Sequence, residues 1–366
     1  MRGQLIDGHY HFSRTSKTTR YDNLEEMLQY IRSAELEAVC VHNIVLWETK
    51  ALLRNPLALL AKLMEPQKVY AFGGVMYPDP EEQWKPYSYR EQAERLLSMG
   101  FDGIKVQNKP LYKREWNITY DHENFDDFWA YLEQENVPIM FHIGDPKEFW
   151  DINRVPKKVF DFGWYYDQNI PPYETYYQET ERILQKFPGL NLTIPHFYFL
   201  SDDLKRCEDF MERYPNVKLD ITPGGEMYFN FSVCQDAARA FFLKYYDRIL
   251  FGTDNHGGDD ESSGAEQLES GINKIREMKS FLEQETCIFG GNSIRGLYLP
   301  QMVLEHIYKE NFVNWVGTAP RQVDGELAEA MVKEISQTAV NRGDGAYLTD
   351  DFEAVLRQLS MYVKKR

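Results

Sequence analysis

The amino-acid sequence predicts an α/β protein with the architecture of a (β/α)8 TIM barrel. Short apolar runs rich in β-branched residues alternate with longer amphipathic patterns over the first 256 residues, which is typical of a parallel sheet with helical crossovers. Several runs are apolar almost without interruption, as strands buried on both faces are. Eight runs can be counted, and eight strands, each followed by a helix, build a closed barrel of this kind.

The strand candidates follow one another at intervals that leave room for a helix or a long loop. The clearest are 137–141 and 248–252, because each is a compact apolar run. The predicted strands are residues 4–11, 36–46, 68–76, 101–106, 137–143, 191–197, 217–222 and 248–253. In a parallel barrel all their carboxyl ends meet at one rim.

Helical patterns fill the intervals, with apolar residues at mixed spacings of three and four. The predicted helices are residues 23–33, 89–99, 124–135, 173–186, 201–214 and 232–245. Gly100 follows its helix as a residue at the carboxyl-terminal cap does, and Ser201 is a candidate N-cap.

Two segments exceed a minimal barrel. Residues 144–172 form a long insertion after the fifth strand, rich in aromatic residues, proline and charge. A loop there lies on the active-site face, so we expect a lid or pocket wall; the plainer alternative is an excursion that packs on a neighbouring loop or subunit. Residues 313–366 carry two helical patterns, expected to wrap the bottom of the barrel or form a dimer contact. The predicted units are therefore a barrel, 1–312, and a helical extension, 313–366.

Composition narrows the partners. The 366 residues carry a formal net charge of −16, which argues against nucleic acid or an anionic membrane as the main partner. The four cysteines are scattered without a C-x-x-C spacing, which indicates reduced thiols rather than a cysteine zinc site. Neither a secretion signal nor a membrane-spanning stretch can be recognised, so we expect a cytoplasmic protein with a small-molecule substrate.

Polar residues stand where the predicted strands end. His9 and His11 close the first strand, and residues two apart on a strand share a face, so the two imidazoles form half of a metal site. The other polar residues at strand ends are Lys105, His142, His196 and Asp254. Polar residues at this rim are typical of a catalytic centre. Three neutral histidines and one carboxylate would leave a divalent cation with an open position for water.

This ordered set resembles the amidohydrolase superfamily, and in particular its amidohydrolase-2 or ACMSD-like branch. The motifs DGHYHF, GIKVQ, MFHIGD, TIPHF and LFGTDN occur in the family's order within residues 1–256. Longer stretches such as HIGDPKEFW and FFLKYYDRILFGTD extend the resemblance to about residue 315. His-x-His alone is a weak signal, but together with two further strand-end histidines and Thr-Asp after the eighth strand it is specific.

The resemblance implies a site with one divalent metal ion. His9, His11 and His142 match the histidine ligands of the family, and Asp254 matches the carboxylate that both contacts the ion and moves protons. Such an ion lowers the pKa of bound water towards about 7, and Asp254 accepts the proton and returns it to a leaving group. Zn²⁺ is the expected ion, although Mn, Fe and Co suit the same ligands.

Other residues of the rim receive roles beside the ion. The resemblance places His196 next to the metal, where it polarises the nucleophile or the substrate and could steady an oxyanion. Lys105 matches a position that becomes a bridging carbamate in two-metal members; binding a substrate carboxylate or a structural contact is the alternative. Glu226, His256 and Trp164 are candidates for substrate contact, or else ordinary residues of the rim and loop.

We therefore expect a metal-dependent hydrolase in which metal-activated water attacks an ester, lactone or amide carbonyl of a small molecule. The alternative is a non-oxidative, metal-dependent decarboxylase of a small carboxylic acid, with aromatic acids among the candidate substrates. The branch that the sequence resembles contains both chemistries. A metal-binding module without catalysis is disfavoured by the intact His196 and Asp254. His122 and His306 are expected to take no part, and so is His42, although it follows the second strand and could approach the mouth of the barrel. A homodimer is the expectation from symmetry alone.

Overall fold

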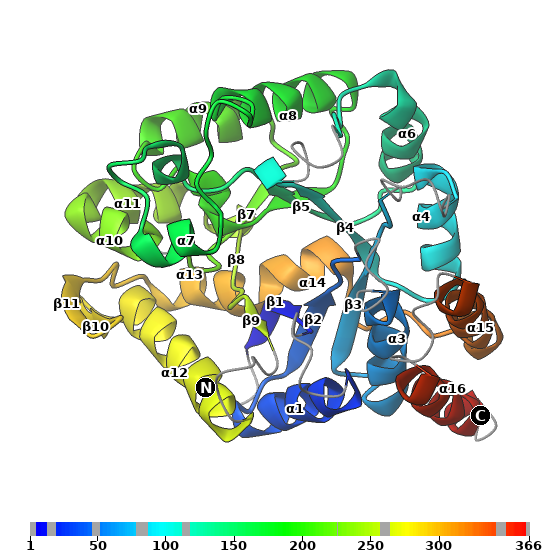
Figure 1. The fold of residues 1–366 in the computed structure, drawn as a ribbon. Helices are drawn as coiled ribbons and strands as arrows, with labels where there is room; N and C mark the ends of the chain where they lie inside the picture. Colours follow the sequence, from blue (N-terminus) through cyan, green and yellow to red (C-terminus); the bar gives the residue numbers. More distant parts are fainter. Residues whose placement is uncertain are drawn as a thin grey trace.

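The computed structural model describes residues 5–12, 20–45, 52–77, 87–111, 118–224, 226–256, 264–341 and 349–363. Figure 1 shows strands gathered in the centre of the molecule, with helices around them and the carboxyl-terminal helices at one side. No helix among these residues combines the length and the apolar character needed to cross a membrane. The four cysteines are unpaired, as expected from their spacing.

A nine-stranded parallel sheet forms the core. From β1 to β8 each strand pairs with the next one along the chain, and β9 pairs with β1. The strands are β1 (Ile6–His11), β2 (Ala38–His42), β3 (Val69–Gly74), β4 (Gly103–Asn108), β5 (Ile139–Ile143), β6 (Leu192–Ile194), β7 (Lys218–Asp220), β8 (Ile249–Leu250) and β9 (Asn255–His256). Seven of the eight predicted runs contain a strand, and the run 101–106 overlaps β4, so the predicted fold class is confirmed.

One chain segment closes the sheet into a barrel. β8 pairs with β7 at one end of the sheet, β9 pairs with β1 at the other, and only residues 251–254 separate them. Within that interval the chain stays bonded to β1, because Gly8 N donates to Phe251 O (3.0 Å) and Asp254 N donates to His9 O (2.9 Å). β8 and β9 are thus two halves of the eighth barrel strand, and Asp254 lies beside His9.

Helices cover the outside of the sheet (Figure 1). They are α1 (Arg20–Ser33), α3 (Arg54–Met64), α4 (Tyr89–Ser98), α6 (Asp126–Gln134), α7 (Lys157–Asp161), α8 (Glu174–Lys186), α9 (Leu204–Arg213), α10 (Met227–Val233), α11 (Gln235–Lys244), α12 (Gly264–Glu283), α13 (Gln301–Glu305), α14 (Asn311–Val316), α15 (Gly325–Asn341) and α16 (Thr349–Val363). An antiparallel hairpin, β10 (Thr286–Phe289) and β11 (Asn292–Arg295), follows α12.

All six predicted helices are present, the last of them split into α10 and α11. Gly100 adopts the left-handed conformation (φ +103°) expected after α4. The predicted cap at Ser201 is wrong: α9 begins at Leu204, and the Asp203 side chain accepts a hydrogen bond from Arg206 N. The carboxylate two residues further on therefore caps this helix, as aspartate commonly does.

The bottom of the barrel is filled by α14 and not by the two later helices, α15 and α16, of the predicted extension. Phe312 and Trp315 pack among residues from the amino-terminal halves of the strands, with ring centroids 5.0 Å from Tyr70 and Phe72 respectively. Helices α15 and α16 instead pack on each other and on α3, at the side of the barrel. The predicted boundary at residue 312 falls inside α14.

Candidate active site

The first strand brings its two histidines together as predicted, with the help of an irregularity. The pairing register of β1 with β2 shifts between Asp7 and Tyr10. His9 Nε2 and His11 Nε2 lie 3.0 Å apart, and His9 Nε2 is 3.4 Å from Lys105 Nζ on β4. A contact from β1 to β4 crosses the inside of the barrel, so the histidine pair lies in the interior.

Hydrogen bonds behind the two rings indicate which nitrogens carry protons. His11 Nδ1 faces the carbonyl oxygen of His42, which can only accept, and His9 Nδ1 lies 2.7 Å from Asp220 Oδ2. With Asp220 ionised, both Nε2 atoms are then acceptors. Asp254 Oδ1 is 3.1 Å from His11 Nε2 and 3.7 Å from His9 Nε2. Three acceptor atoms this close together need a cation between them, and these three residues could hold a metal ion.

Asp220 at the end of β7 supports this arrangement from behind. One carboxylate oxygen holds His9 Nδ1, and the other accepts hydrogen bonds from His196 N (2.8 Å) and Thr222 N (3.1 Å). Burial raises the pKa of Asp220 to about 7. A carboxylate that orients a metal-binding histidine is a recurrent feature of metal sites. Asp220 thus links the candidate metal cluster of His9, His11 and Asp254 to the turn after β6 that begins with His196.

Asp7 holds β1 in place through a second set of hydrogen bonds. Its carboxylate is fully buried and accepts hydrogen bonds from His9 N (3.2 Å), Thr253 N (3.0 Å), Thr253 Oγ1 (2.7 Å) and Tyr30 Oη (2.9 Å). Burial raises the pKa of Asp7 to about 6. The bonds tie β1 to the residue that immediately precedes Asp254.

Asp254 combines a strained backbone with a side chain that reaches solvent. Its φ is +52°, in the left-handed region, and 37% of its side-chain surface is exposed. Burial of the carboxylate raises its pKa, but the neighbouring His11, His9 and His196 outweigh that effect and hold the pKa well below its ordinary value. Asp254 is therefore ionised at neutral pH, in a conformation that surrounding contacts must maintain.

His142 and Lys105 lie at the cluster without completing the three-acceptor group. His142 Nε2 is 3.0 Å from Gly144 O and 3.8 Å from Asp145 Oδ1, so Nε2 carries the proton and a ligand role would use Nδ1. Burial lowers the pKa of His142 to about 3 and that of Lys105 to about 7. A fourth ligand at His142 and a carbamate or substrate contact at Lys105 both stay predictions.

A cavity of about 500 Å³ opens above these residues. It is lined by His11, His142, His196 and Asp254 on one side and by the insertion after β5 on another. The aromatic residues of its wall are Phe12, Phe149, Phe162, Trp164 and Phe199. The insertion, residues 144–172, thus forms part of a pocket wall, and it has a small apolar cluster of its own around Phe149, Tyr166 and Ile170.

The predicted substrate contacts divide into two groups. Trp164 and His256 line the cavity. Glu226 does not line it; it lies behind the Gly224 wall, where burial, with Glu148 among the nearby carboxylates, raises its pKa to about 7.

Other side chains also line this cavity. His42 was expected to take no part unless its place after the second strand brought it to the mouth, and it does line the cavity: its ring centroid is 4.8 Å from that of His9, and its Nε2 is 2.7 Å from Gly8 O. Arg54 and Lys109, which the sequence did not single out, add two cationic side chains to its wall. Their positions could have indicated this role, because His42 ends β2, Lys109 follows β4 and Arg54 begins α3.

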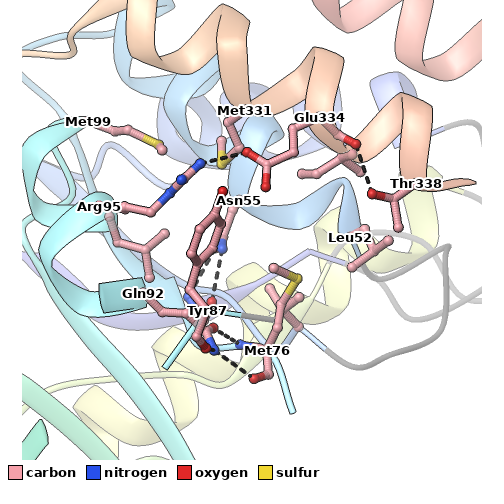
Figure 2. Close-up of a pocket in the computed structure, with 14 residues that line it drawn as sticks. Leu52, Asn55, Met76, Tyr87, Gln92, Arg95, Met99, Met331, Glu334 and Thr338 are labelled. Carbon is pink, nitrogen blue, oxygen red and sulfur yellow. Dashed lines mark hydrogen bonds and ion pairs between the residues drawn. The ribbon is translucent and has the colours of Figure 1, made fainter. Parts of the chain in front are cut away.

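A second cavity, of about 50 Å³, lies between α3, α4 and α15 (Figure 2). Its described lining is mainly apolar and includes Leu52, Met76, Met99, Met331 and Ile335. Arg95 spans it from α4 to form an ion pair with Glu334 on α15 (2.6 Å). The lining contains neither histidine nor cysteine among the described residues, so this cavity is a feature of how the tail packs.

Comparison with solved structures identifies relatives of the fold. A 2,6-dihydroxybenzoate decarboxylase from Rhizobium is 15% identical, with 86% of this chain and 99% of that chain covered and a TM-score of 0.50. A 5-carboxyvanillate decarboxylase from Sphingomonas paucimobilis is 11% identical (85% and 98%, TM-score 0.50). A 4-oxalomesaconate hydratase from Rhodopseudomonas palustris is 12% identical (91% and 99%, TM-score 0.51). At such identities the likeness concerns the fold alone.

Sequence comparison identifies the family. No curated protein sequence matches the chain. Residues 2–297, however, match the profile of the family described as amidohydrolase, which covers the barrel and every residue of the metal cluster. The chain therefore belongs to the amidohydrolase family, whose members are metal-dependent enzymes.

Proposed function

We propose that this chain is a metal-dependent hydrolase that cleaves an ester, lactone or amide bond in a small molecule. The observation that carries the proposal is that His9 Nε2, His11 Nε2 and Asp254 Oδ1 lie together, next to a 500 Å³ cavity that His11 and Asp254 line. Three acceptors that need a cation, next to space for a small molecule, suit hydrolysis assisted by a metal ion.

The donor set fits a divalent ion such as Zn²⁺. Two imidazole nitrogens and one carboxylate oxygen are ligands that zinc accepts, and we propose His142 as the fourth. An ion bound there supplies Lewis acidity, which lowers the pKa of water and polarises a carbonyl group. Asp220 and the carbonyl of His42 hold the two rings from behind, so the ligands are in place before an ion arrives.

Asp254 and His196 are the proposed proton-handling groups. Asp254 is ionised and partly exposed to the cavity, so it can accept a proton from water and pass it to a leaving group. Burial lowers the pKa of His196 to about 4, so its ring is neutral at pH 7. Its Nδ1 faces Thr222 O (3.3 Å), which leaves Nε2 as an acceptor. This favours a hydrogen bond from water to His196 over the stabilisation of an oxyanion.

A second candidate function is decarboxylation of a small carboxylic acid. The observation that favours it is the pair of cationic side chains, Arg54 and Lys109, in a cavity walled by aromatic rings such as Phe149 and Trp164. Cations bind a carboxylate, and flat apolar walls suit an aromatic ring. Two structures of similar fold are named as decarboxylases of aromatic acids.

Product analysis separates the two candidates. Metal-loaded protein would be offered esters, lactones, amides and aromatic carboxylic acids, while acid release and CO₂ release are measured in parallel. We expect acid release that Asp254→Asn reduces by at least about 100-fold, because the proton acceptor is lost. Asp236→Asn, at a side chain that is 94% exposed on α11, is the matched control and should leave the rate unchanged. CO₂ release without hydrolysis would contradict the proposal and establish the second candidate.

We further propose that the protein works in the cytoplasm as a homodimer. Four unpaired thiols suit a reducing compartment. The dimer is a proposal from symmetry, and light scattering on the purified chain would test it.

A further inference from the structure

The chain makes a left-handed turn directly after β6. His196, Phe197, Tyr198 and Phe199 have φ values between +51° and +57°. In this conformation an L-residue brings Cβ close to the following carbonyl oxygen, so residues other than glycine usually adopt it singly. Four in succession store strain, and strained backbone persists only where neighbouring structure holds it, commonly at functional sites.

Two of the four side chains anchor the turn in the core. Phe197 is fully buried, with ring centroids 4.8 Å from Phe231 and 5.1 Å from Phe241. Tyr198 is 1% exposed, and its ring lies 4.6 Å from that of Tyr177. Burial of two large aromatic rings offsets the strain of the backbone.

The backbone of the turn is also held from two sides. His196 N donates to Asp220 Oδ1 (2.8 Å), and Tyr177 Oη donates to Tyr198 O (3.0 Å). Asp220 is the same carboxylate that holds His9 Nδ1, so the turn and the metal cluster share one support. The left-handed conformation is therefore fixed by contacts from β7 and α8.

The other two side chains of the turn point into the cavity and lie against each other. The rings of His196 and Phe199 are stacked, with centroids 5.1 Å apart and planes 18° apart. Phe199 also meets His142 edge-on, with centroids 5.9 Å apart, and lines the cavity. The turn thus reverses the direction of the chain, so that the ring of its last residue, Phe199, lies over the ring of its first, His196.

We propose that Phe199 is a positioning residue that fixes the orientation of the His196 imidazole. The hydrogen bond between His196 Nδ1 and Thr222 O is long, 3.3 Å, and a ring so weakly tethered turns about its Cβ–Cγ bond unless packing blocks it. The face of Phe199 provides that block. What the oriented ring then does rests on the proposed function, but the orientation itself does not.

The left-handed turn can be tested without a substrate. His196→Gly and His196→Ala both remove the imidazole, but only glycine adopts positive φ without strain, so the glycine variant should melt at the higher temperature. His306 is the matched control, because its φ is −61° in a helical segment, and there the alanine variant should melt higher. Equal or reversed melting temperatures at position 196 would overturn the left-handed turn and the proposal with it.

The positioning role can be tested with Phe199→Leu and Phe199→Tyr. In protein labelled at histidine, the stacked phenyl ring should shift the His196 ring-proton resonances upfield; the shift should be lost in the leucine variant and kept in the tyrosine variant. With a substrate in hand, we expect kcat to fall about tenfold or more in the leucine variant, with a smaller change in KM, and to return to within about twofold in the tyrosine variant.

Two results would overturn the positioning role. One is a set of His196 resonances that Phe199→Leu does not move. The other is a change confined to KM, which would make Phe199 a wall of the cavity and no more. The resonance measurement needs no turnover. It therefore tests the positioning role of Phe199 even if the hydrolase proposal fails.

Discussion

Asp220 shows how one buried residue can serve two parts of the site. Its carboxylate joins His9 on β1 to the backbone of His196 in the turn after β6. We predict that Asp220→Asn lowers metal affinity about 10- to 100-fold, because the His9 ring loses its orientation and some of its basicity. Competition with a chromophoric chelator measures the affinity. The exposed Asp236→Asn serves as control, and equal affinities in the two variants would refute the role.

Glu226 makes a prediction about pH. Burial raises its pKa from an ordinary value of 4.5 to about 7, so the folded state binds the proton more tightly than the unfolded chain. Its contribution to stability is complete below pH 4.5 and is lost as the pH rises through 7. Glu226→Gln removes this loss. The free energy of unfolding of the variant should therefore exceed that of the wild type by about 1–3 kcal/mol at pH 8 and equal it at pH 4. Urea unfolding at the two pH values measures the difference; a variant less stable at pH 8 would contradict it.

At the scale of residues, the sequence predicts those site residues that are marked by their spacing along a strand or by their place at the end of one. His9 and His11 follow from alternation along a strand, and Asp254 from its place after the eighth apolar run. The support from Asp220 could not be predicted, because it lies 211 positions from His9 and meets it only across the closed barrel. The orientation of His142, towards Gly144 O, depends in the same way on side-chain packing.

At the scale of elements, the eighth strand passes very close to the first. A Cβ at Gly252 would lie 2.6 Å from His9 Cβ and 2.9 Å from Thr222 Oγ1. We predict that Gly252→Ala lowers the free energy of unfolding by about 1–3 kcal/mol through overpacking and weakens metal binding as well, because His9 must move.

Gly224→Ala is the control for Gly252→Ala. A Cβ at Gly224 meets no atom closer than 3.3 Å, so its effect on stability should be small. Urea denaturation and metal titration of the two variants measure both quantities. A Gly252→Ala variant as stable as the control, with unchanged metal affinity, would show that the strands do not approach as closely as described.

The packing of α15 makes a separate prediction. Ile335 is 7% exposed and borders the small cavity of Figure 2. Ile335→Ala should enlarge the cavity and lower the free energy of unfolding by about 2–4 kcal/mol. Arg95→Gln breaks the nearby ion pair with Glu334. It should lower the free energy of unfolding by less than about 1 kcal/mol, because both side chains are more than one-third exposed. Urea denaturation measures both variants, and the reverse order of effects would contradict apolar docking of the tail.

The elements were predictable where one pattern dominates. Buried parallel strands leave continuous apolar runs, so all eight barrel strands could be located from the sequence. Helix α3 could not, because nearly all of its residues are buried between the barrel and the tail helices, and a helix buried all round has no polar face to set a period. The filling of the barrel bottom by α14 depends on contacts between Trp315 and strands more than 200 residues earlier.

At the scale of the whole molecule, the charge of the chain and the charge of its cavity differ. The formal net charge is −16, yet the cavity lining pairs the carboxylates of Asp145 and Asp254 with the cations of Arg54 and Lys109. The overall charge therefore argues against polyanionic partners, while Arg54 and Lys109 offer contacts for a carboxylate group of a substrate. Closure of the barrel by residues 249–256 brings these cations, the histidines and Asp254 to one rim.

The metal content of the chain tests the central claim most directly. Protein purified without chelators would be analysed by mass spectrometry for metals, beside His11→Ala and Asp254→Ala variants shown by circular dichroism to be folded. We predict about one divalent ion per wild-type chain and much less than one in each variant, because three acceptor atoms hold the ion. Two ions per chain would make Lys105 a bridging carbamate. Wild-type protein that binds no divalent ion, even when it is supplied in excess, would contradict the claim.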